Sequence, residues 1–173
     1  MSIKKITSNG ESLIIDRIKK LDSEITAIRE EKAIAYTASG DTWHDNPGFN
    51  SLEQAEHRKA KEMVELKDLL TTSHKIDITK RNTTFVDVGS IVKCVRISID
   101  DPLSTESIEI WEIGGFGESD PKKNVLSYET PVGSALMGCK PDTETEQTDI
   151  AGKNYIFEIV DLYNSWNECN DKR

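Results

Sequence analysis

The sequence contains few cysteines, few prolines and no long apolar run. Its three cysteines, Cys94, Cys139 and Cys169, are odd in number and share no C-x-x-C spacing, which excludes a recognisable zinc site and argues against a disulfide scaffold. No apolar run approaches the roughly 20 residues of a membrane-spanning helix, and the first twelve residues lack the apolar core of a signal peptide. We therefore expect a cytoplasmic protein without a membrane span.

Apolar residues are also scarce, and basic residues are outnumbered by acidic ones. Of the 173 residues, 36% are apolar and 31% are charged, which is less apolar and more charged than an average globular domain. A long coiled coil produces such a composition, because its surface is large for its mass. The formal net charge of −9 argues against broad, sequence-independent nucleic-acid binding, which requires a basic face.

Charge and proline divide the chain near residue 75. Residues 1–75 carry 12 basic and 13 acidic side chains, whereas residues 76–173 carry 10 and 18. Of the five prolines, only Pro47 precedes residue 76. The length suits one compact domain or two small ones, and this division predicts two differently built parts, 1–75 and 76–173.

The first part has the pattern of two helices with a break. A capping-box pattern, Ser8–Glu11, precedes a seam of apolar residues spaced three, four or seven positions apart. That seam contains Ile14, Ile18, Leu21, Ile25, Ile28 and Ala35. Two glycines and a proline between Gly40 and Asn50 interrupt the helix. A second capping-box pattern, Ser51–Gln54, opens a second seam. Its members are Leu52, Ala55, Lys59, Met63, Leu66 and Leu70.

Two such helices with a short connection predict an antiparallel coiled-coil hairpin, because neither apolar seam is stable in water as an isolated helix. Residues 40–50 then form the acidic tip of the hairpin. The alternative is two helices of an ordinary bundle. That alternative needs further helices, which residues 76–173 do not offer.

The second part is predicted to be β-rich, as a small α+β domain. Three segments have strand-like alternation or a short apolar run. They are residues 90–97, 107–113 and 155–162. Residues 132–138, which follow Pro131, are predicted to form one short helix. The tail from residue 164 onward is polar and is expected to be frayed.

In their order and spacing, several segments resemble the bacterial Gre transcript cleavage factors, which bind RNA polymerase. The resemblance covers most of the chain and begins with the charged helical hairpin. The other matching segments are Gly40-Asp41 with Asp45-Asn46 nearby, Ile76–Thr79, Val88–Val92 and Val125–Gly138.

This resemblance implies a function at the polymerase active site. The hairpin enters the secondary channel, and the tip carboxylates of Asp41 and Asp45 help to hold a second Mg²⁺ beside the polymerase's own catalytic aspartates. The polymerase then hydrolyses the displaced RNA 3′ end. The second domain is FKBP-like and anchors the factor at the outer rim of the channel. The resemblance thus implies a monomeric accessory factor, with no cofactor of its own, whose partners are RNA polymerase and the nascent RNA 3′ end.

Elementary metal chemistry agrees with this role. Mg²⁺ prefers oxygen ligands and is often held by one or two carboxylates together with phosphate oxygens. Two such ions stabilise the attacking and leaving oxygens of phosphoryl transfer. Asp41 and Asp45 therefore suit a shared Mg²⁺, although an aspartate after a glycine, or before Asn46-Pro47, is also a common turn residue.

The tip departs from the family pattern at several positions. Asp41 matches directly, whereas Asp45 stands one residue further along than the expected glutamate and is one methylene shorter. The segment Pro47–Phe49 replaces a small-acidic-tyrosine stretch. Glu53 occupies the position that best matches a basic residue of the family. These differences bear on cleavage activity rather than on polymerase binding.

Further partner contacts are expected along the hairpin and in the second domain. Trp43 either packs against Phe49 or stacks on a base or an apolar polymerase surface. His44 is a weaker candidate for a metal ligand or proton carrier. Arg58 and Lys59 of the second helix either contact RNA phosphates or are simply solvated. In the second domain, Thr130-Pro131 is expected to contact the polymerase.

Three functions remain open from the sequence. The first is stimulation of transcript cleavage by RNA polymerase. The second is a binder of the same shape that occupies the channel and inhibits or modulates the polymerase. The third is a prolyl isomerase on the FKBP-like domain, which needs an aromatic-lined pocket. Several aromatic residues of that domain lie in predicted strands and are expected in its core.

Overall fold

The computed structural model describes residues 3–40, 45–101 and 105–171. The chain divides into two compact units, one of residues 11–73 and one that joins residues 1–10 to residues 74–173. The sequence predicted residues 1–10 as part of the hairpin. In the structure, Lys5–Thr7 pair in parallel with His74–Ile76, which follow the second helix.

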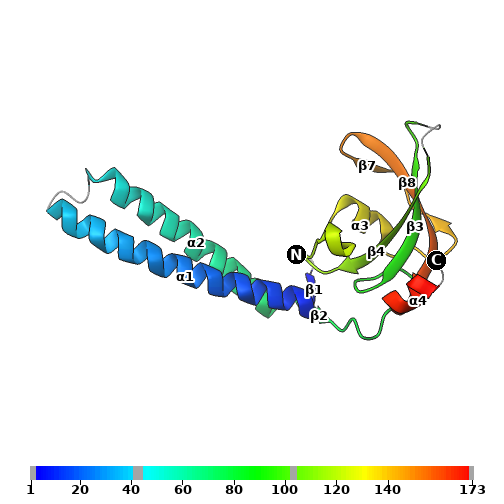
Figure 1. The fold of residues 1–173 in the computed structure, drawn as a ribbon, viewed down its shortest axis with the longest axis horizontal. Coiled ribbons are helices and arrows are strands. Elements are labelled where there is room, and N and C mark those ends of the chain that lie inside the picture. Colours follow the sequence, from blue (N-terminus) through cyan, green and yellow to red (C-terminus); the bar gives the residue numbers. More distant parts are fainter. Residues whose placement is uncertain (1–2, 41–44, 102–104, 172–173) are drawn as a thin grey trace. The chain divides into compact units, whose positions relative to one another are not determined.

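Two long helices form the predicted hairpin. Helix α1 is Ser8–Ser39 and helix α2 is Pro47–Thr72, and Figure 1 shows them running side by side. Ile14, Leu21 and Ile25 are buried at the predicted seam spacing. The hairpin prediction is therefore confirmed, because the apolar stripe of α1 is shielded as the seam pattern requires.

Both helices begin at other residues than the capping-box patterns predict. Thr7 precedes the first residue of α1, and its Oγ1 accepts a hydrogen bond of 3.3 Å from the backbone N–H of Gly10. Helix α2 begins four residues before Ser51, because Asn46 caps it and Pro47 occupies its first turn. Asparagine is among the best N-caps, and proline at the first helical position loses no hydrogen bond.

The second unit is built around one six-stranded sheet. Its strands are β3 (Ile91–Ser98), β4 (Ser107–Gly114), β5 (Val125–Ser127), β6 (Thr143–Glu144), β7 (Thr148–Ile150) and β8 (Lys153–Tyr163). Strands β3, β4 and β8 confirm the three strand predictions, and their neighbours are short strands that the sequence did not predict. The order is β5-β4-β3-β8-β6, and β7 also pairs with β8. A separate parallel pair joins β1 (Lys5–Thr7) to β2 (His74–Ile76).

The core of this unit lies between one face of the sheet and helix α3 (Pro131–Leu136). Val132 and Leu136 of α3 pack with buried residues of β3, β4 and β8. These are Val92, Cys94, Ile113, Phe157, Ile159 and Leu162. The short helix after Pro131 and the α+β fold class, a helical hairpin followed by a β-rich part, are confirmed.

The C-terminal segment is not simply a frayed tail. Residues Trp166–Asp171 form helix α4, and Cys169 is buried with Ile91 and Tyr163, with Trp166 packed against them. The indole Nε1–H of Trp166 also donates to Glu112 Oε2 at 2.8 Å. The expectation of fraying was wrong, because two apolar side chains among polar residues suffice to attach a short helix to a sheet. One further 3₁₀ turn, η2, spans Pro121–Lys123.

Among the residues that the structure describes, no helix is both long enough and apolar enough to cross a membrane.

Candidate functional site

The predicted tip lies between the end of α1 and the start of α2. Gly40 directly follows α1 and has a φ of 54°, the left-handed region in which glycine carries no steric penalty. The candidates Asp41, Trp43 and His44 lie outside the described residues. Asp45 is described, and its side chain is exposed.

Asp45 is held next to a well-capped helix start. The Asn46 side-chain oxygen accepts hydrogen bonds from the backbone N–H groups of Gly48 (2.8 Å) and Phe49 (3.3 Å). The Asn50 N–H donates to the Asn46 carbonyl at 3.1 Å. An exposed carboxylate therefore directly precedes a backbone that is ordered by three hydrogen bonds.

Phe49 attaches this end of α2 to α1. Its side chain is buried, and its ring centroid lies 6.4 Å from that of Tyr36. The Lys32 ammonium lies 5.5 Å from the Phe49 ring centroid. The two helices border a surface pocket of about 430 Å³ here, to which Arg29 and Glu56 also contribute. Phe49 thus fixes the helix start that carries Asp45.

The carboxylate of Glu56 in α2 forms ion pairs with two basic side chains of α1. Arg29 Nε donates to Oε1 at 2.7 Å, and Lys32 Nζ donates to Oε2 at 2.8 Å. The hydrogen bonds from Lys32 and Arg29 lower the pKa of the Glu56 carboxyl below its ordinary value. This side chain therefore links α1 and α2 near the end of the hairpin.

A second set of ion pairs lies further along the hairpin. Lys59 Nζ donates to Glu24 Oε2 at 2.6 Å, and this hydrogen bond is the largest cause of the lowered pKa of Glu24. Arg17 makes a two-pronged contact with Glu62, at 2.8 Å and 3.1 Å. The predicted RNA contact Lys59 is therefore engaged within the hairpin, whereas Arg58 is exposed.

No metal centre is assembled among the described residues. In residues 3–40, 45–101 and 105–171, no three or more His, Cys, Asp or Glu side chains lie close enough together to hold an ion. The exposed Asp45 offers carboxylate oxygens, which suit Mg²⁺, but it offers them singly. A single carboxylate is too few ligands to form a metal site of its own.

In the second unit, Thr130 and Pro131 have different positions. The Thr130 hydroxyl accepts from the Gly133 N–H at 3.1 Å and donates to the Ser127 carbonyl at 2.8 Å, so it caps α3. Pro131 is exposed and borders a groove beside α3. Of these two candidates, Pro131 has an exposed side chain, whereas Thr130 is half-buried and its hydroxyl is engaged in the cap.

Sequence reasoning missed the Phe49 anchor and the role of Glu56 as a helix link. A signal for Glu56 existed, since opposite charges recur on the two predicted helices. Their register is set only when the helices pack, however, so the particular partners were not readable from the sequence.

Taken together, these features define a class of protein: a coiled-coil hairpin with an exposed carboxylate beside its capped turn, and a separate β-rich unit. A family profile described as "Transcription elongation factor, GreA/GreB, C-term" matches residues 81–164. The transcription elongation factor GreA of Azorhizobium caulinodans is 32% identical over 118 residues, covering 64% of this chain and 71% of the relative. The GreA of a Bradyrhizobium species is 28% identical over 157 residues, covering 90% and 95%.

The chain belongs to the GreA/GreB family of transcription elongation factors, so the resemblance noted in the sequence is confirmed. Among solved structures, it is similar to the GreA factor homolog 1 (Gfh1) protein of Thermus thermophilus, with a TM-score of 0.42 and 18% identity. That comparison covers 94% of this chain and 99% of the other.

Proposed function

We propose that this protein binds RNA polymerase through the secondary channel and stimulates cleavage of backtracked nascent RNA by the polymerase's own active site. It is an accessory factor and not itself the nuclease. Family membership supports the polymerase as the partner. The observation that carries the cleavage role is Asp45, an exposed carboxylate fixed beside the capped start of α2.

The hairpin's part in this chemistry is to present carboxylate oxygens. Asp41 and Asp45 would contribute ligands to a Mg²⁺ ion that is shared with the polymerase. When bound, that ion supplies positive charge to the oxygens that attack and leave the phosphorus atom. Ligand distances to Mg²⁺ vary little, about 2.0–2.1 Å, so a carboxylate that binds this ion must be placed closely. The hydrogen bonds of Asn46 restrict the backbone next to Asp45 and thereby limit where its carboxylate lies.

The ion pairs along the hairpin serve the same purpose. Glu56 and Glu24 each bind cations of the opposite helix, and Phe49 is buried close to the turn. Exposed pairs contribute little individually, but several along one seam resist sliding of α1 against α2. A helix pair in fixed register places the carboxylate at its turn reproducibly. Catalysis that depends on holding a group in the right geometry requires this.

A second candidate function is occupation of the channel without cleavage. The cations Arg29, Lys32 and Lys59 are all engaged with glutamates, which leaves fewer of them to hold RNA phosphates. The turn also has Pro47–Phe49 where the family pattern has an acidic residue. These two observations favour a factor that inhibits or modulates the polymerase.

One experiment separates the two functions. A backtracked elongation complex with 3′-end-labelled RNA is incubated with Mg²⁺, with and without the protein, and short labelled fragments are measured over time. The proposed function predicts a rate increase that depends on the protein concentration. If no such fragments appear, and the same complexes elongate more slowly in the presence of the protein once nucleoside triphosphates are added, the second candidate is established. No binding to the polymerase would contradict both.

A further inference from the structure

The pocket of about 430 Å³ between α1 and α2 combines positive charge with aromatic surface. Its lining includes Arg29, Lys32, Glu56, Tyr36 and Phe49, which all belong to one compact unit. Two cations and one carboxylate give this lining a net charge of +1, whereas the whole chain has a formal net charge of −9. The pocket is therefore a local exception to the acidic character of the protein.

The guanidinium group of Arg29 is held through one atom. Its Nε donates to Glu56 Oε1 at 2.7 Å, and among the described residues its two Nη groups have no hydrogen-bond partner. The Arg29 side chain is 65% exposed. Glu56 is fixed in turn by Lys32, which donates to its other carboxylate oxygen at 2.8 Å. Arg29 thus has a defined direction and two open Nη groups.

Arg17 of the same helix has the opposite arrangement. Its Nε and Nη2 both donate to the carboxylate of Glu62, at 2.8 Å and 3.1 Å, and its Nη1 lies 3.8 Å from Glu24 Oε1. A guanidinium bound in this two-pronged way has already used the geometry that a further anion requires. The two arginines differ in how their carboxylate partner is placed, so Arg29 is the one with donors available to a ligand.

An aromatic surface lies on the same side of α1 as Arg29. Tyr36 is seven residues further along, which places it about two turns away on the same helix face. Tyr36 is 52% exposed, and its ring centroid lies 6.4 Å from that of the buried Phe49. An open guanidinium and an accessible ring are the two groups that recognise a phosphate and a base.

We infer that this pocket binds a free mononucleotide, with its phosphate on the Nη groups of Arg29 and its base stacked on Tyr36. The planar guanidinium donates two parallel hydrogen bonds to phosphate oxygens, and a tyrosine ring stacks on any base. The volume of the pocket is within the usual range of small-ligand sites. This ligand goes beyond the proposed function, because its binding involves neither the tip carboxylates nor the polymerase.

The charges of the hairpin disfavour an RNA strand as the occupant. Single-strand binding needs a positively charged groove that follows several phosphates. Residues 1–75 carry 12 basic and 13 acidic side chains, and Arg17 and Lys59 form ion pairs with Glu62 and Glu24. One open arginine beside one exposed ring complements a single nucleotide.

Calorimetric titration of the full chain with adenosine 5′-monophosphate tests the inference. Arg29→Gln is expected to weaken binding about tenfold, because charge-assisted hydrogen bonds to the phosphate are lost. Arg29→Lys keeps the charge without the planar fork and is expected to weaken binding about fivefold. Tyr36→Leu keeps an apolar side chain beside Phe49 but removes the stacking ring, and a loss of about fivefold is expected. Adenosine and inorganic phosphate are each expected to bind more weakly than the nucleotide.

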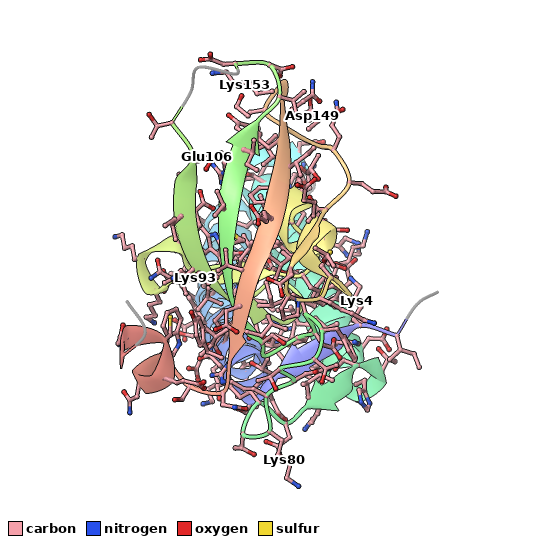
Figure 2. All side chains as sticks on the ribbon, turned by 90° about the vertical axis from the view of Figure 1, so that its right-hand side faces the viewer. Lys4, Lys80, Lys93, Glu106, Asp149 and Lys153 are labelled. Atoms are coloured by element: carbon pink, nitrogen blue, oxygen red, sulfur yellow. The ribbon has the colours of Figure 1, made fainter. Side chains whose placement is uncertain are left out.

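Two control variants remove one positive charge at other positions. Arg17→Gln does so at the arginine whose donors are taken by Glu62. Lys80→Gln does so in the connection between β2 and β3, where Figure 2 shows the Lys80 side chain pointing away from the sheet. Both are expected to bind the nucleotide within about twofold of the parent, because salt screens distant exposed charges. Thermal unfolding checks that every variant folds.

Four results would overturn the inference. A parent chain that does not bind the nucleotide has no such site. A loss in Arg17→Gln as large as in Arg29→Gln would reduce the binding to net charge, and inorganic phosphate that binds as tightly as the nucleotide would remove the base from the pocket. A tetra-adenosine RNA that binds more than about tenfold more tightly than the mononucleotide would make the occupant an RNA strand. Each of these results leaves the cleavage proposal intact, because the polymerase assay depends on the tip carboxylates.

Discussion

Thr7 and Glu118, 111 positions apart in the sequence, are joined by two hydrogen bonds. The Thr7 backbone N–H donates to Glu118 Oε1 at 2.9 Å, and the Thr7 hydroxyl donates to Oε2 at 2.6 Å. In a capping box, the carboxylate that binds the N-cap N–H comes from three residues further along the helix. Here that residue is Gly10, and a distant glutamate takes the role.

The fit around Glu118 depends on two glycines. The Glu118 side chain is buried, and a Cβ atom on Gly10 or Gly115 would overlap its Oε1 atom. Any side chain at either position therefore displaces the carboxylate that caps the first turn of α1. This relationship explains why Gly10 is acceptable at the beginning of a long helix, where glycine otherwise costs stability.

We predict that Glu118→Ala lowers the free energy of unfolding by about 1–3 kcal/mol, because it leaves buried donors of Thr7 without an acceptor. Glu118→Gln is expected to lower it less, since the amide oxygen still accepts one of the two hydrogen bonds. Urea unfolding measures both. Glu106→Ala, at an exposed residue, is the control and is expected to match the parent; a Glu118→Ala chain as stable as that control would contradict the capping role.

Acid is predicted to loosen the hairpin. Hydrogen bonds from cations lower the pKa values of Glu24 and Glu56 below their ordinary value of 4.5. Their ion pairs therefore contribute their full stabilisation above pH 4.5, and this contribution is lost as the pH falls through the lowered pKa values. Helical circular dichroism during thermal unfolding at pH 7 and pH 3 measures the loss.

Glu56→Gln separates this effect from general acid denaturation. The variant lacks the titrating group, so it is expected to be less stable than the parent at pH 7 and to lose less stability on acidification. Identical pH profiles for the parent and Glu56→Gln would show that the pairs with Arg29 and Lys32 do not stabilise the hairpin.

The cap of α2 is predicted to matter for both stability and activity. Asn46→Ala removes the acceptor for the N–H groups of Gly48 and Phe49 and is expected to cost about 1 kcal/mol. Asn46→Asp keeps a good cap and serves as the matched control. If Asp45 acts through its fixed position, Asn46→Ala also lowers the rate of transcript cleavage while polymerase affinity stays nearly unchanged.

The carboxylate at position 45 is predicted to act in cleavage. Asp45→Ala is expected to reduce stimulated cleavage strongly, Asp45→Glu to retain part of it, and both to bind the polymerase nearly as well as the parent, since one lost ligand contributes little to a whole interface. Asp41→Asn is expected to abolish cleavage in the same assay. An Asp45→Ala chain that cleaves like the parent would make Asp45 a turn residue.

Much of the fold followed from local patterns. Leu21 and Ile25 are buried because they belong to a seam with helical spacing, and that spacing is readable without knowing any partner. The alternation in β3 and β4 is local in the same sense. The segments around Gly40 and at Val125–Gly138 that resemble the family are also local patterns. The resemblance that they carry was enough to predict Asp45 as a tip carboxylate without its tertiary contacts.

Other features depend on residues that meet only after folding. Both Asn46 and Ser51 are suitable N-caps for α2. The helix begins after Asn46, and this earlier start includes Phe49, whose ring contacts Tyr36 of α1. Helix α4 forms from a polar tail because Trp166 and Cys169 find an apolar site on Ile91 and Tyr163. No local pattern contains that information.

Spacing and composition over a few neighbouring residues suffice to predict the two-part organisation, the hairpin, the main strands and the acidic character of the tip. They do not show that Glu118 caps α1, that Lys59 pairs with Glu24, or that Glu144 lies opposite Glu158. One cause underlies all three of these contacts. Hydrogen bonds and charge interactions act over a few ångströms, and only the packing of distant segments brings these groups within that range.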